Sequence, residues 1–202
     1  MQPFTYLTAI AAPLLRDNID TDAIIPSREM RSVSKTGLAD GLFAGERYLT
    51  IGGRDPDPAF VLNQSAYAGT QILLAGGNFG CGSSREHAAW ALAEYGIRAI
   101  VAPSFNPIFH GNCIRNGIVP VVLDAATIAA LAAQASRITI DLPAQTLTGP
   151  DGIAHSFPIA DEAREMLLEG LDAIDLTLKR RDEIERFVAA DKISRRWAYP
   201  HA

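Results

Sequence analysis

Cysteine is scarce in this chain of 202 residues, which contains only Cys81 and Cys113. Two thiols cannot build a disulfide framework, so the composition indicates a reducing compartment. They are also too few for an iron–sulfur cluster, which takes about three or four thiolates. No apolar run approaches the roughly 20 residues of a membrane span, and residues 1–6 lack the basic flank and apolar core of a signal peptide. We therefore expect a cytoplasmic protein.

Positive charge is scarce as well. The chain has 18 Lys and Arg residues against 23 Asp and Glu, a net charge of −5, which argues against a nucleic-acid binder. A hydrophobic fraction of 48% and a mean hydropathy of +0.09 are typical of a soluble globular protein. A chain of this length buries roughly 70% of its unfolded surface, so the fold needs no disulfide or metal to hold it.

Strand-like and helix-like segments alternate along most of the chain. Strands are expected at residues 4–12 (ended by Pro13), 71–75, 97–102 and 118–123, and helices at 84–95, 104–116 and 124–135. A hairpin is expected from 137–142 and 146–157, with its turn at 149–152, and helices resume near Asp161. This alternation predicts an α/β fold.

Two segments depart from the pattern. Residues 27–58 have no clear periodicity and mix basic side chains with glycines, and a loop this long is functional or disordered. We expect a long mobile loop there. Residues 179–202 form a charged helical tail with seven basic and four acidic residues, a net +3 that leaves −8 on the rest of the chain. Such a tail is either a solvated helical face or a docking surface for an acidic partner.

The most informative segment is residues 75–87, which read AGGNFGCGSSREH between a predicted strand and a predicted helix. Backbone N–H groups at a helix N-terminus lack partners within the helix, and the helix dipole favours negative charge there. Arg85 adds a planar cation suited to carboxylate or phosphate. Gly80 and Gly82 are expected to let a ligand approach the backbone. The segment therefore predicts an anion site.

Several known motifs do not fit this segment. Ser83 stands where a P-loop has lysine, Arg85 replaces the third glycine of a dinucleotide fingerprint, and no Gly-x-Ser-x-Gly elbow is present. The four histidines are scattered, without a zinc-ligand spacing. Taken alone, Ser83 fits the first position of a capping box that ends at Glu86. By the same reasoning His87 is a buried or orienting residue, and Cys81 a small turn residue.

A family resemblance goes further than these local patterns. Residues 78–88, NFGCGSSREHA, resemble the signature of the swivel domain of the aconitase superfamily, and more narrowly that of bacterial isopropylmalate isomerase small subunits. Further stretches of the chain are similar to the same family in the same order: DNIDTDAIIP at 17–26, KTG at 35–37, GLF at 41–43, PAFVLN at 58–63 and APSF at 102–105. The match covers most of the chain.

The resemblance implies a swivelling β/β/α three-layer domain that spans residues 1–202 and closes over a large subunit. It implies that the large subunit carries a four-iron four-sulfur cluster, that the active site forms between the two chains as a heterodimer or higher assembly, and that this chain binds no metal. It assigns the general base, a serine alkoxide, to Ser83, and the substrate carboxylate to Arg85 with help from Ser84. A cation among Arg28, Arg31 and Lys35 is expected to reach the substrate, with Lys35 the leading candidate.

The activity that the resemblance implies is a hydro-lyase that isomerises 2- and 3-isopropylmalate in leucine biosynthesis. A methylmalate (citraconate) or dimethylmalate hydratase subunit is the alternative within the same class, because one or two methylenes change binding by only about 1–3 kcal/mol in an apolar pocket. A non-catalytic ligand-binding module of the same fold is the alternative outside that class.

Overall fold

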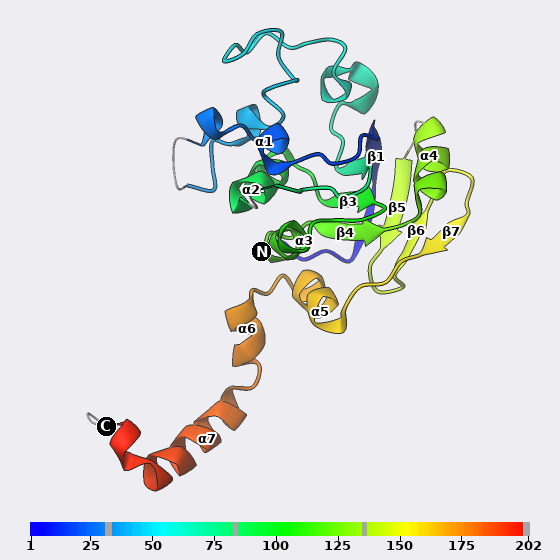
Figure 1. The fold of residues 1–202 in the computed structure, drawn as a ribbon. Coiled ribbons are helices and arrows are strands. Elements are labelled where there is room, and N and C mark those ends of the chain that lie inside the picture. Colours follow the sequence, from blue (N-terminus) through cyan, green and yellow to red (C-terminus); the bar gives the residue numbers. More distant parts are fainter. Residues whose placement is uncertain (31–33, 83–84, 135–136, 200–202) are drawn as a thin grey trace.

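The computed structural model describes residues 1–30, 34–82, 85–134 and 137–199, and its centre is a seven-stranded mixed sheet (Figure 1). The strand order is β4-β3-β2-β1-β5-β6-β7. The strands are β1 (Tyr6–Leu14), β2 (Ile72–Ala75), β3 (Ala99–Ala102), β4 (Val119–Val122), β5 (Arg137–Asp141), β6 (Thr146–Thr148) and β7 (Ala154–Ser156). The α/β class expected from the sequence is confirmed.

The first strand of the chain lies in the middle of this sheet. On one side β1 pairs in parallel with β2, and on the other it pairs antiparallel with β5. The strand runs through Pro13 to Leu14, so the prediction that Pro13 ends it is wrong. Beyond Ile10 the described pairing of β1 is with β2 alone, and a residue without an N–H is tolerated where one side of a strand is unpaired.

Helices cover both faces of the sheet. The described helices are α1 (Thr21–Ile24), α2 (Glu86–Tyr95), α3 (Pro107–Arg115), α4 (Ala125–Ala133), α5 (Asp161–Glu169), α6 (Ala173–Leu178) and α7 (Arg181–Ser194), of which α7 lies away from the sheet (Figure 1). Sequence signals explain several ends: Asn106 and Asp124 cap α3 and α4 with their side chains, and Gly96 ends α2 in a left-handed conformation.

The buried strands divide their side chains between two cores. In β2, Ile72 and Leu74 face the core that contains residues of α4 and α5, whereas Leu73 and Ala75 face the core that contains residues of α2 and α3. A parallel strand that is covered on both faces is apolar along its whole length, as this one is. The alternation fixes the register of β2, and with it the position of the loop that follows.

The expected hairpin is a three-stranded meander instead. Residues 149–152 do turn the chain, but they join β6 to β7, and a second turn joins β5 to β6. The prediction joined two short strands into one arm because β6 and β7 have only three residues each, too few to show an alternating pattern of their own.

The described part of segment 27–58 contains short 3₁₀ helices at Ser27–Glu29 and Ala39–Gly41, with further ones following at Val61–Asn63 and Ser65–Tyr67. Leu38, Leu42 and Phe43 are buried in the same core as α2 and α3. The segment is therefore anchored to the body by its middle, while its mobility stays a prediction. The described part of the chain contains no helix with both the length and the apolar character of a membrane span.

Candidate functional site

The glycine-rich loop, residues 76–82, connects β2 to α2 and is held on one side by residues 17–22. Asp17 Oδ1 accepts a hydrogen bond from the Gly77 amide at 2.6 Å. The Gly80 amide donates to the Ile19 carbonyl at 2.8 Å, and the Thr21 amide donates to the Cys81 carbonyl at 3.0 Å. Asparagine and aspartate are dense in this segment because they hydrogen-bond to nearby backbone in turns. Two stretches of the family resemblance thus meet in space.

On its other side the loop is held by the residues that follow β3. Ser104 Oγ accepts from the Asn78 amide at 2.8 Å, and the Ser104 carbonyl accepts from the Phe79 amide at 3.0 Å. Phe79 itself is fully buried and meets the rings of Phe105 and Phe109 edge-on, with centroids 6.4 and 5.5 Å away. The loop is therefore fixed by hydrogen bonds on both sides and by an aromatic anchor beneath.

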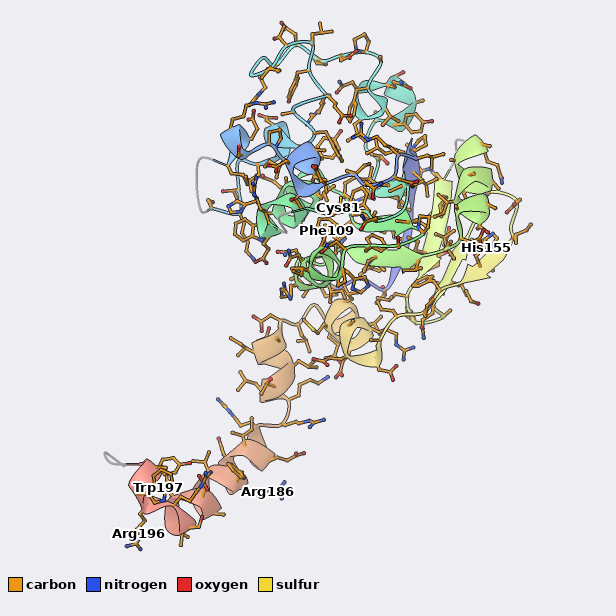
Figure 2. The ribbon with its side chains drawn as sticks, in the orientation of Figure 1. Cys81, Phe109, His155, Arg186, Arg196 and Trp197 are labelled. Atoms are coloured by element: carbon orange, nitrogen blue, oxygen red, sulfur yellow. The ribbon has the colours of Figure 1, made fainter. Side chains whose placement is uncertain are left out.

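Gly80 serves this packing, and the expectation that it opens the backbone to a ligand is wrong. Its φ is +74°, and a Cβ built there would lie 2.1 Å from Cγ of Phe109. Figure 2 labels Phe109 together with Cys81, the residue that follows Gly80. The space above the Gly80 Cα is taken by an aromatic ring, which the sequence pattern alone does not reveal because Phe109 lies on α3.

Arg85 is the described site residue that the structure places at the end of this loop. Arg85 occupies the N-cap position of α2 with an extended backbone, and its side chain makes no capping hydrogen bond to the helix. The helix begins at Glu86, whereas a capping box that starts at Ser83 requires Glu86 to be the third helical residue. The capping-box interpretation is therefore wrong. The Arg85 side chain, 31% exposed, instead reaches across to α1, where Nη1 lies 2.5 Å from Oδ1 of Asp22.

Asp22 is a site residue that sequence reasoning missed. It is exposed on α1, which is itself positioned by the side-chain cap of Asp20 on the Ala23 amide. The pairing occupies one nitrogen of the guanidinium fork and fixes its orientation, so the remaining nitrogens of Arg85 can meet a carboxylate. The available signal was the density of acidic residues in DNIDTD, although nothing in the sequence indicates which of them faces Arg85.

Three predicted site residues, Ser83, Ser84 and Arg31, lie outside the described residues. Lys35 and Arg28 are described, and the polar contacts given for them are with residues other than Arg85. Lys35 Nζ lies 5.3 Å from the centre of the Trp90 ring and 3.4 Å from Oδ1 of Asn116. Arg28 Nη2 donates to the Ala44 carbonyl at 3.2 Å, and its Nε lies 3.3 Å from Oε1 of Glu29.

A short chain of contacts links Lys35 to the start of α2. The side-chain oxygen of Asn116 accepts a hydrogen bond from Lys35 Nζ, and Nδ2 of the same amide donates to Oε1 of Glu86 at 3.0 Å. Glu86 directly follows Arg85 in sequence. Lys35 therefore lies on the α3 side of the α2 N-terminus, and Arg85 on the α1 side.

Glu94 anchors the loop that carries Lys35, and sequence reasoning missed this role as well. Its carboxylate accepts hydrogen bonds from the amides of Gly37, Leu38 and Ala39, at 2.5 to 2.9 Å. Burial opposes the charged form, but these three donors outweigh it and lower the pKa of Glu94. The backbone that follows Lys35 is thus tied to the C-terminal half of α2.

The cysteines do not fit an iron–sulfur cluster. Cys113 is fully buried among the apolar side chains of α3, and this burial raises the pKa of its thiol far above the ordinary value. Cys81, on the loop, is the one partly accessible thiol of the chain. Within the described ranges no three His, Cys, Asp or Glu side chains are grouped to hold a metal ion. His155, on β7, is far from the loop in Figure 2.

Comparison with known proteins identifies the family of this chain. The aconitase C-terminal domain model matches residues 1–126, and the LeuD_N model matches residues 128–161. A 3-isopropylmalate dehydratase small subunit from Cupriavidus necator is 60% identical, with 98% of this chain and 99% of the relative covered. The chain belongs to the family of 3-isopropylmalate dehydratase small subunits.

Other members of the family are similar over the same length. The small subunit from Agrobacterium fabrum is 48% identical over 98% of this chain and 100% of its own. The crystal structure of 3-isopropylmalate dehydratase from Methanocaldococcus jannaschii superposes with a TM-score of 0.67 at 28% identity, covering 90% of this chain and 99% of that one. The family predicted from residues 78–88 and the accompanying motifs is confirmed.

Proposed function

We propose that this chain is the small subunit of a 3-isopropylmalate dehydratase that interconverts 2- and 3-isopropylmalate through 2-isopropylmaleate in leucine biosynthesis. The observation that carries the proposal is the fixed cation at the N-terminus of α2: Arg85, oriented by Asp22, directly after the loop held by residues 17–22 and 104–106. A cation at a helix N-terminus suits a dicarboxylate substrate.

Ser83 is the general base of this proposal. A serine hydroxyl is a weak acid, and each pKa unit by which its anion is stabilised corresponds to about 1.4 kcal/mol. Arg85 and the unsatisfied amides at the start of α2 favour that anion. The alkoxide takes the proton from one substrate carbon, and the hydroxyl on the neighbouring carbon leaves as hydroxide while the alkene forms. Hydroxide then adds to the carbon that lost the proton, Ser83 gives its proton to the carbon that lost the hydroxyl, and the alkoxide is restored.

Substrate binding is shared among the cations of the site. Arg85, assisted by Ser84, holds one carboxylate. Lys35 is the leading candidate for a second contact, with Arg28 and Arg31 as the alternatives on the same loop. The anchoring of residues 37–39 by Glu94 supports a defined position for that loop beside α2.

The partner in this proposal is a large subunit, joined as a heterodimer or higher assembly in the cytoplasm. The relatives are named small subunits, and such a name implies a second, larger chain. The four-iron four-sulfur cluster is assigned to that chain, in keeping with a small subunit whose two thiols cannot hold it. The whole of residues 1–202 acts as one swivel domain that closes over the partner.

The test is turnover by this chain reconstituted anaerobically with the large subunit of the same organism, on isopropylmaleate, citraconate and dimethylmaleate. We expect isopropylmaleate to be hydrated fastest. Preference for a smaller maleate would move the protein to a methylmalate or dimethylmalate hydratase with the same site. Turnover of none of them by a complex with an intact cluster would favour a binding module and refute the proposal.

Substitution of the base sharpens the test. Ser83→Ala should abolish turnover with the assembly intact, because the variant lacks the hydroxyl that moves the proton. Ser65→Ala is the matched control, since Ser65 is exposed on a 3₁₀ helix away from the loop. A Ser83→Ala complex that retains wild-type turnover would remove Ser83 from the mechanism.

A further inference from the structure

The last part of the chain leaves the body of the protein. Figure 1 shows α7 projecting away from the sheet and its covering helices. We call residues 181–199, which comprise α7 and the 3₁₀ helix Arg196–Ala198, the C-terminal arm. The body ends with α5 and α6, whose Met166, Leu167 and Leu176 still pack against the core.

The side-chain hydrogen bonds given for the arm lie within it. The one buried residue of α7 is Asp191, and it is covered by the arm's own side chains. Arg195 binds its carboxylate through Nε and Nη2 at 2.5 and 2.8 Å, and the Tyr199 hydroxyl donates to it at 2.9 Å. These contacts close the end of the helix and hold the following turn in place.

The same arm exposes large apolar side chains. Ile184, Phe187 and Val188 lie on one face of α7, at positions i, i+3 and i+4, and Phe187 is 63% exposed. Trp197, at the tip in Figure 2, is 79% exposed. A helix of 14 residues is marginal in water on its own. An uncovered helix with exposed Phe and Trp is typical of a surface that is buried in an assembly.

We propose that the C-terminal arm is a docking element that holds this chain on the large subunit, in an apolar groove that receives Phe187 and Trp197. The inference rests on the proposed function, which supplies the partner. It places the contact away from the Arg85 face, which has to open and close over substrate if the domain swivels. A contact outside that face keeps the two chains together while the site is open, at a high effective concentration.

The comparisons support this occupant. The family models end at residue 161, so the arm lies beyond the part that defines the fold. Yet 98% of this chain aligns with full-length small subunits, which leaves about four residues of 202 unmatched, too few to remove the 19 residues of the arm. The arm is therefore a feature of small subunits beyond the fold itself.

A second copy of this chain is the less favourable occupant. The arm carries five basic and four acidic side chains, so two arms side by side bring together segments that are each net +1. Like charges at an interface disfavour pairing and lower the rate of encounter. The large subunit is therefore the partner that we expect the arm to bind.

The experiment measures assembly and turnover separately, using tagged large subunit and the full-length chain. The test variant is Phe187→Ser/Trp197→Ser, and the control is Glu183→Ala/Glu185→Ala, which changes polar positions on the same helix. We expect the test variant to raise the Kd for the large subunit at least about tenfold and the control to stay within about twofold. The thermal unfolding midpoint should be the same for both, because the arm adds nothing to the core.

The outcomes separate the inference from the function on which it rests. An unchanged Kd for the test variant, or self-association of the isolated chain that depends on Phe187 and Trp197, overturns the inference. If the test variant is insoluble, the chain ending at residue 180 replaces it, with the same expected loss. A variant complex that regains wild-type turnover at high subunit concentration supports a docking role. A wild-type complex that assembles through the arm but turns over nothing refutes the proposed function and leaves the docking role standing.

Discussion

Replacing Gly80 with alanine tests how the glycine-rich loop is positioned. Two costs arise. The residue has φ +74°, a left-handed conformation that costs an L-residue roughly 1–2 kcal/mol. The new Cβ also meets Phe109 Cγ at 2.1 Å and Cδ1 at 2.3 Å, and forcing extra volume into a packed core costs about 1–3 kcal/mol.

Together these terms predict a loss of about 2–5 kcal/mol in the free energy of unfolding. For a chain of this size that corresponds to a fall of roughly 4–20 °C in Tm. The assay is urea unfolding followed by circular dichroism, with Tm from calorimetry. Phe109 cannot yield without disturbing Phe79, which it meets edge-on, so turnover should fall as well because the loop that leads to Arg85 shifts.

Gly52→Ala is the matched control. Gly52 has φ +79°, but a Cβ at this position would meet nothing within 4 Å, so the substitution carries the backbone cost without the clash and should lose only about 1–2 kcal/mol. Phe109→Leu should recover part of the Gly80→Ala loss, giving a favourable coupling in a double-mutant cycle. Equal losses for Gly80→Ala and Gly52→Ala, with no such coupling, would refute the packing argument.

Three further predictions concern the charges and thiols of the site. Arg85→Lys keeps the cation but loses the planar fork that Asp22 orients, so kcat/KM in the reconstituted complex should fall at least about tenfold with Tm nearly unchanged; a variant with normal kinetics would contradict the role of Arg85. Because the pKa of Glu94 is lowered in the folded protein, its stabilisation is present above the ordinary value of 4.5 and is lost as pH falls through the lower folded value. Glu94→Gln should therefore be less stable than wild type at pH 7, by about 1 kcal/mol given its exposure, and the difference should shrink in acid; a pH-independent difference would count against it. Iodoacetamide at pH 8 should modify Cys81 in the native chain and Cys113 only after denaturation, because burial raises the pKa of the Cys113 thiol; mass spectrometry of the peptides decides, and rapid native labelling of Cys113 would be the contrary result.

The repeating parts of the fold could be predicted from the sequence because local patterns determine them. The strands at 71–75, 97–102 and 118–123 were predicted within two residues of their observed ends, since buried parallel strands are short apolar runs between turn signals. Asp124 and Gly96 were identified as helix ends because capping depends on the residue type at one position. The sequence does not predict that β1 continues through Pro13 or that residues 146–157 form two strands. Both features depend on pairing with strands that are distant in the sequence.

The candidate site shows the same division. The family pattern at 78–88 located Arg85, and the structure places it at the end of the loop as expected. The partners that give the site its geometry come from distant segments: Asp22 is 63 positions from Arg85, and Glu94 is 57 positions from Gly37. Such pairs have no signature in one sequence, because a surface aspartate and an orienting aspartate are the same residue type.

The central position of β1 has a consequence for how the protein is made. Residues 6–10 leave the ribosome about 130 residues ahead of their antiparallel partner on β5. The parallel half can assemble while the chain is still growing, and until residue 137 is synthesised one edge of β1 stays unpaired and open to other chains. Nascent chains that stall before β5 should therefore be the species that aggregate or recruit chaperones. Once the β5–β7 meander has formed, the exposed edge of β1 is paired and this risk of aggregation ends.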